Sequence, residues 1–318
     1  MKDKQMIKKE KMQKSGKLKT KLLNEKQIQV GTEIIKSGGT VVFRTETVYG
    51  LGANATNEDA VKKIFEAKGR PAVNPLIVHF SSLKEVLARF PDIDNVTRMV
   101  LKKVKSAITV ILSRPDWIPL VTTGGLETVA VRVPSCKFAR KFIKACGVPL
   151  AAPSANTSTR PSPTRWQDAY EDLDGQVNAI FCGGATDIGL ESTVVKVHAD
   201  EIQVLRLGGI CTKELSKKTG MKVEHNATNE SPGTQFKHYA PSCPLRVVED
   251  VSAFESLKNV KTIRCVDLGK KPEKKLFAII RDAEKQCDMI VCEKFPNAPE
   301  YEAINDRLLR ASAENERK

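Results

Sequence analysis

The chain has 318 residues, of which 41% are apolar and 5% aromatic, so it is long enough for two ordinary domains with aliphatic cores. No apolar run approaches the ~20 residues that span a bilayer, so we expect no membrane-spanning helix and no membrane partner. The formal net charge is +14, and residues 1–22, with nine lysines against Asp3 and Glu10, hold half of it.

Residues 1–22 are predicted to form a disordered basic tail, because a lysine-rich run with few large apolar side chains cannot bury a core. A solubilising extension is the simplest role for this tail; weak contact with tRNA or other RNA and a nuclear address are the alternatives. The eight cysteines are scattered without a Cys-x-x-Cys pair, which fits neither a zinc site nor a disulfide framework. We therefore expect reduced thiols and a cytoplasmic protein.

Residues 23–219 are predicted to form one α/β domain, because helical and extended patterns alternate along them. Helical patterns cover residues 24–36, 57–69, 81–89, 95–105, 136–146 and a stretch that begins at 162–164. Extended patterns, rich in β-branched residues, cover residues 40–43, 76–80, 107–112, 128–133, 149–152, 178–181, 192–198 and 201–206. A glycine-bearing polar turn is predicted at 45–52 and a loop at 122–125.

Residues 220–244 break this alternation and are predicted to form a linker. The run from Asn226 to Gly233 is rich in Asn, Thr, Ser, Pro and Gly, which are typical of linkers and turns. Residues 245–318 resume a smaller α/β pattern, with strands predicted at 245–249, 261–266 and 288–292 and helices between and after them. This second domain is small, so we expect it to dock on the first to bury its core.

Polar side chains collect at the ends of the predicted elements between residues 45 and 79, where they can converge on a ligand. Lys68 and Arg70 lie two apart at the end of a helix, and a guanidinium fork beside a mobile ammonium suits one anionic group. Alone, such a pair is usually two solvated cations, and His79 in an apolar strand is usually structural. Further candidates at predicted strand ends, where open α/β sheets bind ligands, are Asn74, Arg132 and residues 154–156.

The chain contains no Walker loop, no Rossmann glycine fingerprint and no metal-ligand spacing. A bound nucleotide would therefore depend on side-chain cations and hydroxyls to hold its phosphates. A nucleophilic triad is also unsupported, because Ser154 and Ser192 have no flanking elbow and only four histidines are present. Charge neutralisation and positioning are thus favoured over covalent catalysis.

Seven motifs occur in the order in which one protein family carries them. They are Thr45-Glu46-Thr47-x-Tyr49-Gly50-Leu51, Lys68-x-Arg70-Pro71, Asn74-Pro75-Leu76, Val131-Arg132-x-Pro134, Ala152-Pro153-Ser154-Ala155-Asn156, Ser192-Thr193-Val194, and Ser231-Pro232-Gly233 with His238-Tyr239-Ala240-Pro241. From about residue 25 to the C-terminus, the chain closely resembles the YrdC-type threonylcarbamoyl-AMP synthases in their long, two-domain form. The resemblance implies an α/β fold: a YrdC-like domain with a twisted mixed sheet and flanking helices around a large cleft, then a smaller C-terminal Rossmann-like α/β domain.

The resemblance also implies a reaction, in which L-threonine, bicarbonate and ATP give threonylcarbamoyl-adenylate and pyrophosphate. Such a nucleotidyltransferase passes its product to a separate threonylcarbamoyl transferase, which modifies an adenosine beside the anticodon of tRNA. The threonine amine and bicarbonate form a carbamate that must attack the α-phosphate. Both partners are anions, so cations are needed to screen their repulsion. Mg²⁺ is expected with ATP, and the sequence identifies no protein ligands for it.

The resemblance assigns roles to individual residues, position by position. The threonine site is expected at Thr47, His79, Arg132, Ala152 and Ser192. The ATP contacts are expected at Arg70, Asn74, Thr128, Ser154, Ser162, Arg206 and Tyr239. The catalytic group around the reacting phosphate is expected at Lys68, Arg70 and Asn156. Residues 231–241, which include Tyr239, resemble a lid that folds over the nucleotide and excludes water from the adenylate.

The chain departs from the family at Arg44, where proline is usual, and this residue is expected to add a cation at the mouth of the site. Thr234-Gln235-Phe236 replaces the commoner Met-x-Tyr of the lid and removes one phenol. Two other functions stay open. An RNA-binding protein of the same fold would bind double-stranded RNA in a salt-sensitive way without ATP turnover. A carbamoyl-adenylate enzyme with a different acceptor is the closer alternative.

Overall fold

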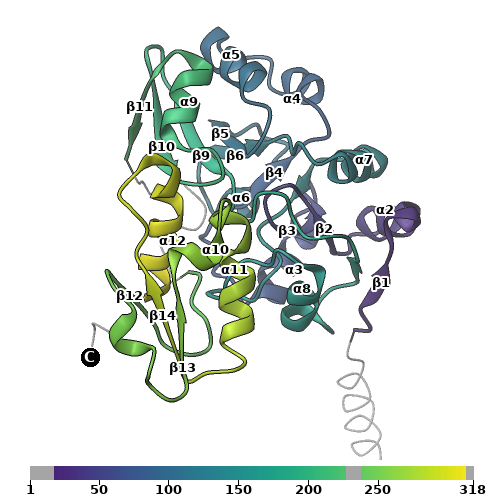
Figure 1. Ribbon diagram of the computed structural model, residues 1–318. Coiled ribbons are helices and arrows are strands. Elements are labelled where there is room, and N and C mark those ends of the chain that lie inside the picture. The colour runs from purple at the N-terminus through teal and green to yellow at the C-terminus, as the bar shows by residue number, and fades with distance from the viewer. Residues whose placement is uncertain (1–17, 227–237, 313–318) are drawn as a thin grey trace, which may run out of the picture.

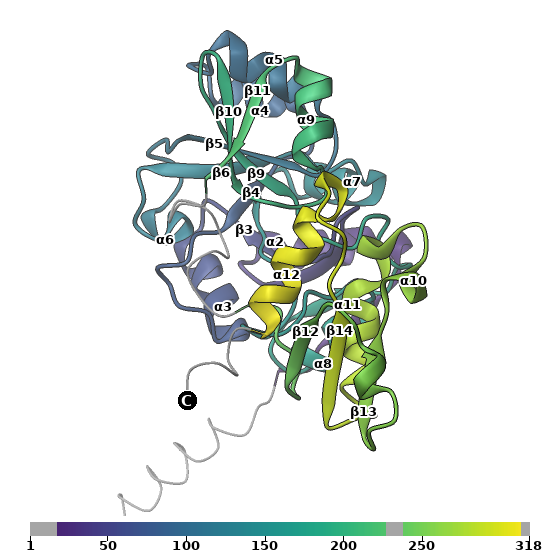
Figure 2. The same cartoon turned by 60° about the vertical axis from the view of Figure 1, so that its left-hand side comes forward.

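The structure of the protein is a computed structural model that describes residues 18–226 and 238–312 (Figure 1). An N-terminal α/β unit contains a large mixed sheet, and a smaller unit with a three-stranded sheet follows it in the chain. Figures 1 and 2 show the small unit packed beside the large one, with α11 (Pro272–Ala283) and α12 (Glu302–Ser312) next to it. Among the described helices, none is long and apolar enough to cross a membrane.

The large sheet has the strand order β1-β8-β2-β3-β7-β4-β6-β5-β9-β10-β11 within the described residues. Parallel and antiparallel neighbours are mixed, since β4 runs parallel to β6 but antiparallel to β7. The strands are β1 (Lys21–Leu23), β2 (Val41–Arg44), β3 (Tyr49–Asn54), β4 (Ile77–His79), β5 (Ile108–Ser113), β6 (Thr128–Arg132), β7 (Leu150–Ala151), β8 (Ala179–Phe181), β9 (Thr193–Val197), β10 (Glu201–Arg206) and β11 (Lys222–His225). The mixed sheet with flanking helices that the resemblance implies is confirmed.

Helices cover this sheet and close its aliphatic core. They are a 3₁₀ turn at Glu25–Gln27, α2 (Ile28–Lys36), α3 (Glu58–Lys68), α4 (Leu83–Arg89), α5 (Asn95–Lys103), α6 (Leu120–Thr123), α7 (Lys137–Cys146), α8 (Trp166–Leu173) and α9 (Thr212–Thr219). Beneath α7, the Phe142 ring lies 5.5 Å from Phe43 of β2 and 5.2 Å from Phe181 of β8, centroid to centroid. These rings belong to one buried cluster, which fixes α7 against the sheet.

The helix α3 shows how local sequence sets the position of two candidate site residues. The side chain of Asn57 fixes its start by accepting a hydrogen bond from the backbone N–H of Ala60 at 3.0 Å. Gly69 ends it with a φ of 59°, in the left-handed region that glycine adopts without strain. Lys68 and Arg70 therefore leave the helix at a defined point beside the sheet.

The sequence predicts a single polar turn at residues 45–52, and this prediction is wrong. β3 begins at Tyr49 and pairs antiparallel with β2. Gly52 makes this close pairing possible, because a Cβ at that position would lie 2.7 Å from the Phe43 ring. Residues whose glycines and polar side chains predict a turn therefore form part of a strand, which packs against the buried ring of Phe43.

Two short strands form where the sequence predicts a tail and a linker. β1 begins at Lys21, inside the predicted tail, and pairs parallel with β8. β11 lies inside the predicted linker and pairs parallel with β10. Both are edge strands of three or four residues, too short to show a period of their own. The helix α6 also forms where a loop is predicted at 122–125.

The small unit contains a parallel three-stranded sheet with strand order β12-β14-β13. Its described elements are β12 (Leu245–Val248), a 3₁₀ turn at Ser252–Phe254, β13 (Val260–Ile263), α10 (Cys265–Leu268), α11, β14 (Met289–Glu293), a 3₁₀ turn at Pro299–Tyr301 and α12. Parallel strands need crossover connections, and helices supply them here. The α/β character predicted for this region is confirmed, whereas the exact boundaries at residues 23, 220 and 245 stay predictions.

Candidate active site

A cavity of about 630 Å³, including its open mouth, lies where several strands of the large sheet end. Of the predicted site residues, the cavity wall brings together Arg70, His79, Arg132, Ala152, Ser154, Asn156, Ser162, Ser192, Arg206 and Tyr239. Arg160, Glu191 and His238 also line it, although the sequence pattern assigns no role to them.

The sheet topology delivers these side chains from distant parts of the chain. β4 and β6 pair in parallel, so that His79 lies opposite Arg132 at their carboxyl ends. Ser192 directly precedes β9, and Arg206 ends the neighbouring β10. The pairing of β9 with β10 changes register between Val204 and Arg206, and such a bulge redirects the side chain that follows it.

A buried ion pair holds Arg132 at the cavity wall. Its Nη2 donates to Glu46 Oε1 at 2.6 Å and to Thr47 Oγ1 at 2.7 Å. Burial raises the pKa of Glu46, but the charge and hydrogen bond of Arg132 more than offset this, so the pKa lies below its usual value. The Arg132 Nε is buried and has no hydrogen-bond partner among the described residues. The guanidinium is therefore fixed and charged, with a donor still available to a ligand.

Glu46 is the supporting residue that the sequence pattern does not identify. It lies within the Thr45-Glu46-Thr47 motif, yet it is 86 residues from Arg132 and is only 3% exposed. Its second oxygen, Oε2, accepts the backbone N–H of Cys136 at 3.3 Å. The sequence did contain one signal for this role, a carboxylate between the two hydroxyl-bearing residues Thr45 and Thr47. A carboxylate that is buried requires a charged partner.

His79 lies in this end of the cavity as a neutral imidazole. Its Nδ1 lies 3.1 Å from the carbonyl oxygen of Ile77, so Nδ1 carries the proton and donates it. Burial, followed by repulsion from Arg132, lowers the pKa of His79 to about 3. Next to it, Ser192 Oγ lies 2.7 Å from Thr109 Oγ1. These are neutral polar groups near the fixed cation of Arg132, and Ser192 also contacts a second cation, because Arg206 Nη2 donates to its carbonyl oxygen at 2.7 Å.

We expect His79→Gln to flatten the dependence of folding stability on pH between pH 7 and pH 4. In the unfolded chain this imidazole binds a proton below about pH 6.5, whereas in the folded protein it stays neutral to about pH 3. The unfolded state thus binds more protons in this window, so the free energy of unfolding falls as pH falls, by ~1.4 kcal/mol per unit at the steepest. Urea unfolding at pH 7 and pH 5 measures the slope. His238, with a pKa also lowered to about 3, should retain part of it, and an unchanged slope in the variant would contradict the expectation.

A second group of cations lines the cavity next to the first. Arg70 donates through Nε to the carbonyl oxygen of Asn74 at 3.2 Å and through Nη2 to Asn74 Oδ1 at 2.5 Å and the Pro75 carbonyl at 2.9 Å. Burial and then repulsion from Arg206 lower the pKa of Arg70 to about 9, so it stays charged at neutral pH. Asn74 itself does not line the cavity but orients Arg70 from behind. Two arginines that repel each other favour an anionic ligand between them.

Lys68 lies behind the cavity wall. It is 1% exposed, and its Nζ donates to the carbonyl oxygens of Ser154, at 2.6 Å, and Asn156. Burial, followed by repulsion from Arg70, lowers its pKa well below the usual value. The ammonium therefore shapes the loop after β7, which presents Ser154 and Asn156 to the cavity, and makes no contact of its own with the cavity space.

The small unit supports two lining residues of the cavity, although none of its own described residues lines it. The Tyr239 ring stacks on Phe277 of α11 at 5.5 Å, and the guanidinium of Arg307 from α12 lies 4.8 Å above its centroid. Ser162 Oγ donates to Glu191, whose other oxygen accepts from Arg307 Nε at 3.0 Å. Tyr239 and Ser162 thus both reach the cavity through contacts with the small unit.

Thr128 is not brought to this cavity, although it is an expected ATP contact. It starts β6, four residues before Arg132, so the strand separates the two by ~13 Å. Thr128 lines a different surface cavity, together with Ser113, Arg114 and Lys196. The threonine-site residue Thr47 is buried next to Arg132 and contacts the cavity indirectly.

Arg44 does not add a cation at the mouth of the cavity. Its side chain points toward Glu25, 3.7 Å from Nε, and Asp187, 4.0 Å from Nη1, and it does not line the cavity. The Tyr49 phenol also lies elsewhere, because it donates to the Gly184 carbonyl at 2.7 Å. The lid residues Ser231-Pro232-Gly233 and Thr234-Gln235-Phe236 lie outside the described residues.

The described side chains form no cluster of three or more His, Cys, Asp or Glu residues that could hold a metal ion. Glu191 is the carboxylate among the described lining residues, and both of its oxygens are already engaged by Ser162 and Arg307.

The chain matches two family models. One, described as "Telomere recombination" for the Sua5, YciO and YrdC proteins, matches residues 33–208, and one described as "Threonylcarbamoyl-AMP synthase, C-terminal domain" matches residues 197–313. A threonylcarbamoyl-AMP synthase of Bacillus subtilis is 37% identical over 324 residues, which cover 91% of this chain and 94% of that protein. One of Pyrococcus abyssi is 43% identical over 235 residues, covering 71% of this chain and 69% of that protein.

Solved structures are similar over both units. The crystal structure of Pyrococcus abyssi Sua5 complexed with L-threonine superposes with a TM-score of 0.85 at 35% identity, covering 92% of this chain and 98% of that one. Full-length HypF, at 18% identity and a TM-score of 0.52, covers 57% of this chain and shares the fold alone.

Proposed function

This chain belongs to the threonylcarbamoyl-AMP synthase family, and on that premise we propose that it makes threonylcarbamoyl-AMP and pyrophosphate from L-threonine, bicarbonate and ATP. The observation that carries the proposal is the charge of the cavity wall. Four arginines line it, at positions 70, 132, 160 and 206, against the single carboxylate of Glu191 among the described residues. Substrates with a carboxylate, a carbamate and a triphosphate need such a surplus of positive charge.

The chemistry divides into two steps that balance without a redox partner. The threonine amine adds to bicarbonate to give a carbamate and water. A carbamate oxygen then attacks the α-phosphorus of ATP, and the bond from phosphorus to the bridging oxygen breaks to release pyrophosphate. The enzyme is thus a nucleotidyltransferase whose side chains hold two anions in line for the attack.

We assign the threonine end to the buried group around Arg132. The donor that Arg132 has left after bonding Glu46 and Thr47 suits the threonine carboxylate, and neutral His79 and Ser192 offer polar contacts without adding charge. Ala152 supplies an apolar wall beside them. Holding the amine next to a neutral imidazole favours the unprotonated amine that must attack bicarbonate.

We assign the phosphate end to Arg70 and Arg206, with Ser154 and Asn156 as neutral contacts. Ser162, whose hydrogen is donated to Glu191, is assigned to a donor group of the nucleotide instead. Besides burial, repulsion from Arg206 lowers the pKa of Arg70, and repulsion from Arg132 is among the causes that lower the pKa of Arg206, so Arg206 interacts with both of the other cations. The α-phosphate is therefore expected near Arg206, where the two substrates meet. ATP enters as its magnesium complex, and Lys68 and Asn74 support the loops that contact it.

The test is to incubate the protein with Mg·ATP, bicarbonate and isotopically labelled L-threonine and to look for threonylcarbamoyl-AMP by mass. Pyrophosphate release should require both threonine and bicarbonate, so each is omitted in turn as a control. Well-folded protein without threonine-dependent pyrophosphate release would overturn the synthase proposal.

Deletion of residues 1–17 should leave turnover unchanged in the absence of tRNA. The cut stops short of Thr20, whose Oγ1 donates to the Val177 carbonyl at 2.8 Å, and of β1 at Lys21–Leu23. Steady-state pyrophosphate release by the shortened and full-length proteins measures the effect. A large fall in kcat with an unchanged unfolding temperature would show instead that the basic tail takes part in turnover.

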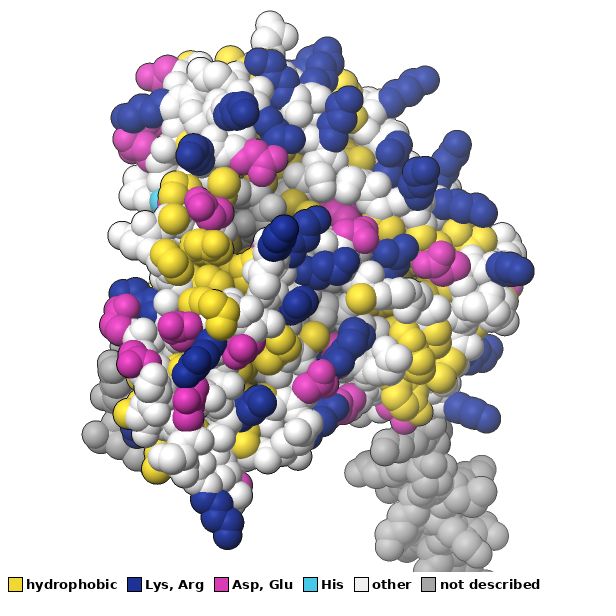
Figure 3. Space-filling view, in the orientation of Figure 1, with side chains coloured by type: hydrophobic (Ala, Val, Ile, Leu, Met, Phe, Trp, Pro, Cys, Tyr) yellow, Lys and Arg dark blue, Asp and Glu magenta, His cyan; other side chains and the backbone are white. Residues whose placement is uncertain are grey.

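The partners that follow are a separate threonylcarbamoyl transferase and, weakly, tRNA, and we place the reaction in the cytoplasm. Figure 3 shows Lys and Arg side chains spread over the upper part of the molecule, where α5, α7 and α9 lie. α7 alone carries four of them and no acidic residue. This surface supports a salt-sensitive contact with RNA in addition to the charge of the tail.

A further inference from the structure

Two arginines of the small unit are the largest side chains that are fully buried. Arg281 of α11 is 0% exposed and Arg307 of α12 is 1% exposed. Each guanidinium donates most of its hydrogen bonds to residues of the N-terminal unit. Both reach across to the N-terminal unit. Arg281 contacts the short segment that contains Ser162, an expected ATP contact, and Arg307 is linked to Ser162 through Glu191.

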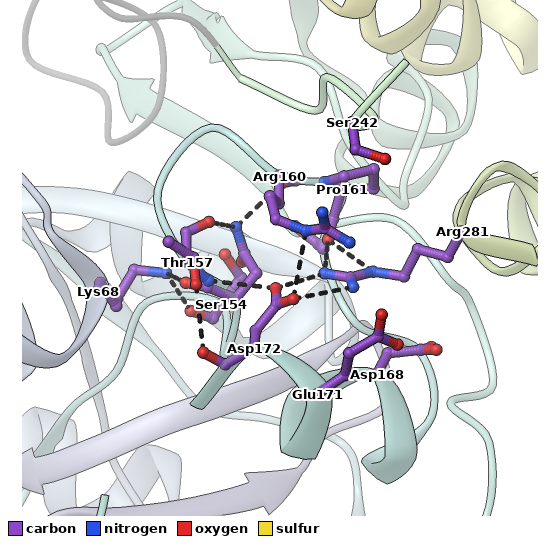
Figure 4. Close-up of polar contacts among 12 residues, drawn as sticks. Lys68, Ser154, Thr157, Arg160, Pro161, Asp168, Glu171, Asp172, Ser242 and Arg281 are labelled. Atoms are coloured by element: carbon purple, nitrogen blue, oxygen red, sulfur yellow. Dashed lines mark hydrogen bonds and ion pairs between the residues drawn. The ribbon is translucent and has the colours of Figure 1, made fainter. Parts of the chain in front are cut away.

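Arg281 holds one side of this segment (Figure 4). Its Nε and Nη2 donate to the carbonyl oxygen of Pro161 at 3.1 and 2.6 Å, and its Nη1 and Nη2 donate to the two oxygens of Asp172 at 3.2 and 2.7 Å. The guanidinium therefore fixes a backbone carbonyl next to Ser162 and a carboxylate of α8 at the same time.

Asp172 in turn fixes the start of the same loop (Figure 4). Its Oδ2 accepts the backbone N–H of Thr157 at 3.2 Å, and its Oδ1 lies 3.2 Å from Nε of Arg160, which lines the cavity. The turn immediately before Thr157, at Ser154 and Asn156, is held by Lys68. The loop after β7 is thus held at successive points. Two of these depend on the small unit, because Arg281 bonds Pro161 and Glu284 bonds Arg160 at 2.6 Å.

Arg307 holds the other side of Ser162. It donates to Glu191 Oε2 at 3.0 Å and to the Leu207 carbonyl at 2.7 Å, and Glu191 accepts the Ser162 hydroxyl through its other oxygen. The Ser162 hydroxyl therefore has its hydrogen committed to Glu191, so toward a ligand it can act only as an acceptor. Arg307 also lies over the Tyr239 ring.

We propose that Arg281 and Arg307 are positioning residues for the nucleotide half of the active site, so that ATP binds fully only when the small unit is docked. The assignment of Ser162 and its loop to ATP rests on the proposed function. Arg281 bonds the carbonyl oxygen of Pro161, and Arg307 bonds the carboxylate of Glu191, which accepts the Ser162 hydroxyl. They do not contact the described residues at the threonine end, so threonine binding should not depend on them.

The ion pair between Lys285 and Glu171 crosses the same interface without this connection, which makes it a suitable control. Lys285, two residues after α11, donates to Glu171 at 2.6 Å, and both side chains are more than two-fifths exposed. Glu171 and Lys285 contact neither the loop after β7 nor the cavity. If the arginines only hold the two units together, variants at Lys285 and at Arg281 should differ in the free energy of unfolding and not in ATP affinity.

The experiment measures binding without turnover, so that it does not depend on catalysis. We expect Arg281→Met to weaken the affinity for Mg·ATP, measured by calorimetry without threonine, by about tenfold, which corresponds to one lost charged hydrogen bond. Threonine affinity in the absence of ATP should stay at the wild-type value. Lys285→Met should change neither affinity.

A second variant guards against misfolding of the first. Arg281→Lys keeps the charge but loses the planar fork, and it should give the same selective loss of ATP affinity with a smaller loss of unfolding temperature. Unchanged ATP affinity in a folded Arg281 variant, or an equal loss of ATP and threonine affinity, would overturn the proposal. Absence of threonine-dependent pyrophosphate release in the wild type would count against the proposed function only.

Discussion

Replacing Arg132 with methionine should abolish threonine-dependent pyrophosphate release, lowering kcat/KM for threonine by ~10³-fold or more. The guanidinium is the fixed cation at the proposed threonine end. It lines the cavity, and its buried Nε has no hydrogen-bond partner among the described residues. Methionine has a similar length but neither charge nor donors. Steady-state kinetics at saturating ATP, with threonine varied, measure the loss.

The same substitution should also destabilise the fold, because it leaves Glu46 buried without its partner. Breaking a buried ion pair from one side typically costs ~3–5 kcal/mol. The double variant Arg132→Met/Glu46→Gln removes the stranded charge, so its free energy of unfolding should recover most of that loss while activity stays absent. If the double variant regained activity together with stability, Arg132 would be a structural residue and not a threonine ligand.

Local structure was predictable where a few adjacent residues decide it. The helix α3 begins at the Asn57 cap and ends at Gly69, both of which the sequence identifies by residue type and spacing. The buried strands β5 and β6 follow from runs of β-branched residues. These elements placed Lys68, Arg70, His79 and Arg132 at element ends, and the structure confirms those positions.

The partners of these residues were not predictable, because they come from distant segments. Glu46 meets Arg132 across 86 residues, and Lys68 meets the Ser154 carbonyl across the same separation. Only the order of strands in the sheet brings such segments together, and a single sequence does not determine that order. Arg44 shows the same limit, because its direction is set by Glu25 and Asp187 and not by its neighbours.

The small unit illustrates a further limit. Its helices could be expected from their apolar spacing, but the same spacing gives no indication that Arg281 and Arg307 point into the neighbouring unit. A charged residue in an amphipathic helix normally faces solvent. Here each arginine can be buried because a carboxylate and a backbone carbonyl of the other unit accept its hydrogen bonds.

Replacing Arg70 with alanine should remove ATP-dependent turnover while leaving the fold intact. Arg70 is the cation at the phosphate end that has the fewest structural duties, because its described partners are Asn74 and the Pro75 carbonyl, both within five residues. Its loss relieves the repulsion with Arg206 and the cost of burial, so the free energy of unfolding should change by no more than ~1–2 kcal/mol. Loss of a positioned cation at a reacting phosphate should lower kcat by ~10²–10³-fold.

Arg140→Ala is the matched control for that prediction, since Arg140 lies on α7 outside the cavity and donates to the Ser81 carbonyl at 3.0 Å. Its kinetic constants should equal those of the wild type. The effect of Arg70→Ala should appear with ATP and not with threonine, whose affinity measured by calorimetry should be retained. An Arg70→Ala protein that unfolds at the wild-type temperature and still releases pyrophosphate at the wild-type rate would mean that Arg206, with Arg160, holds the phosphates by itself. The charge surplus of the cavity would then serve binding of the nucleotide as a whole, without a dedicated cation at the point of attack.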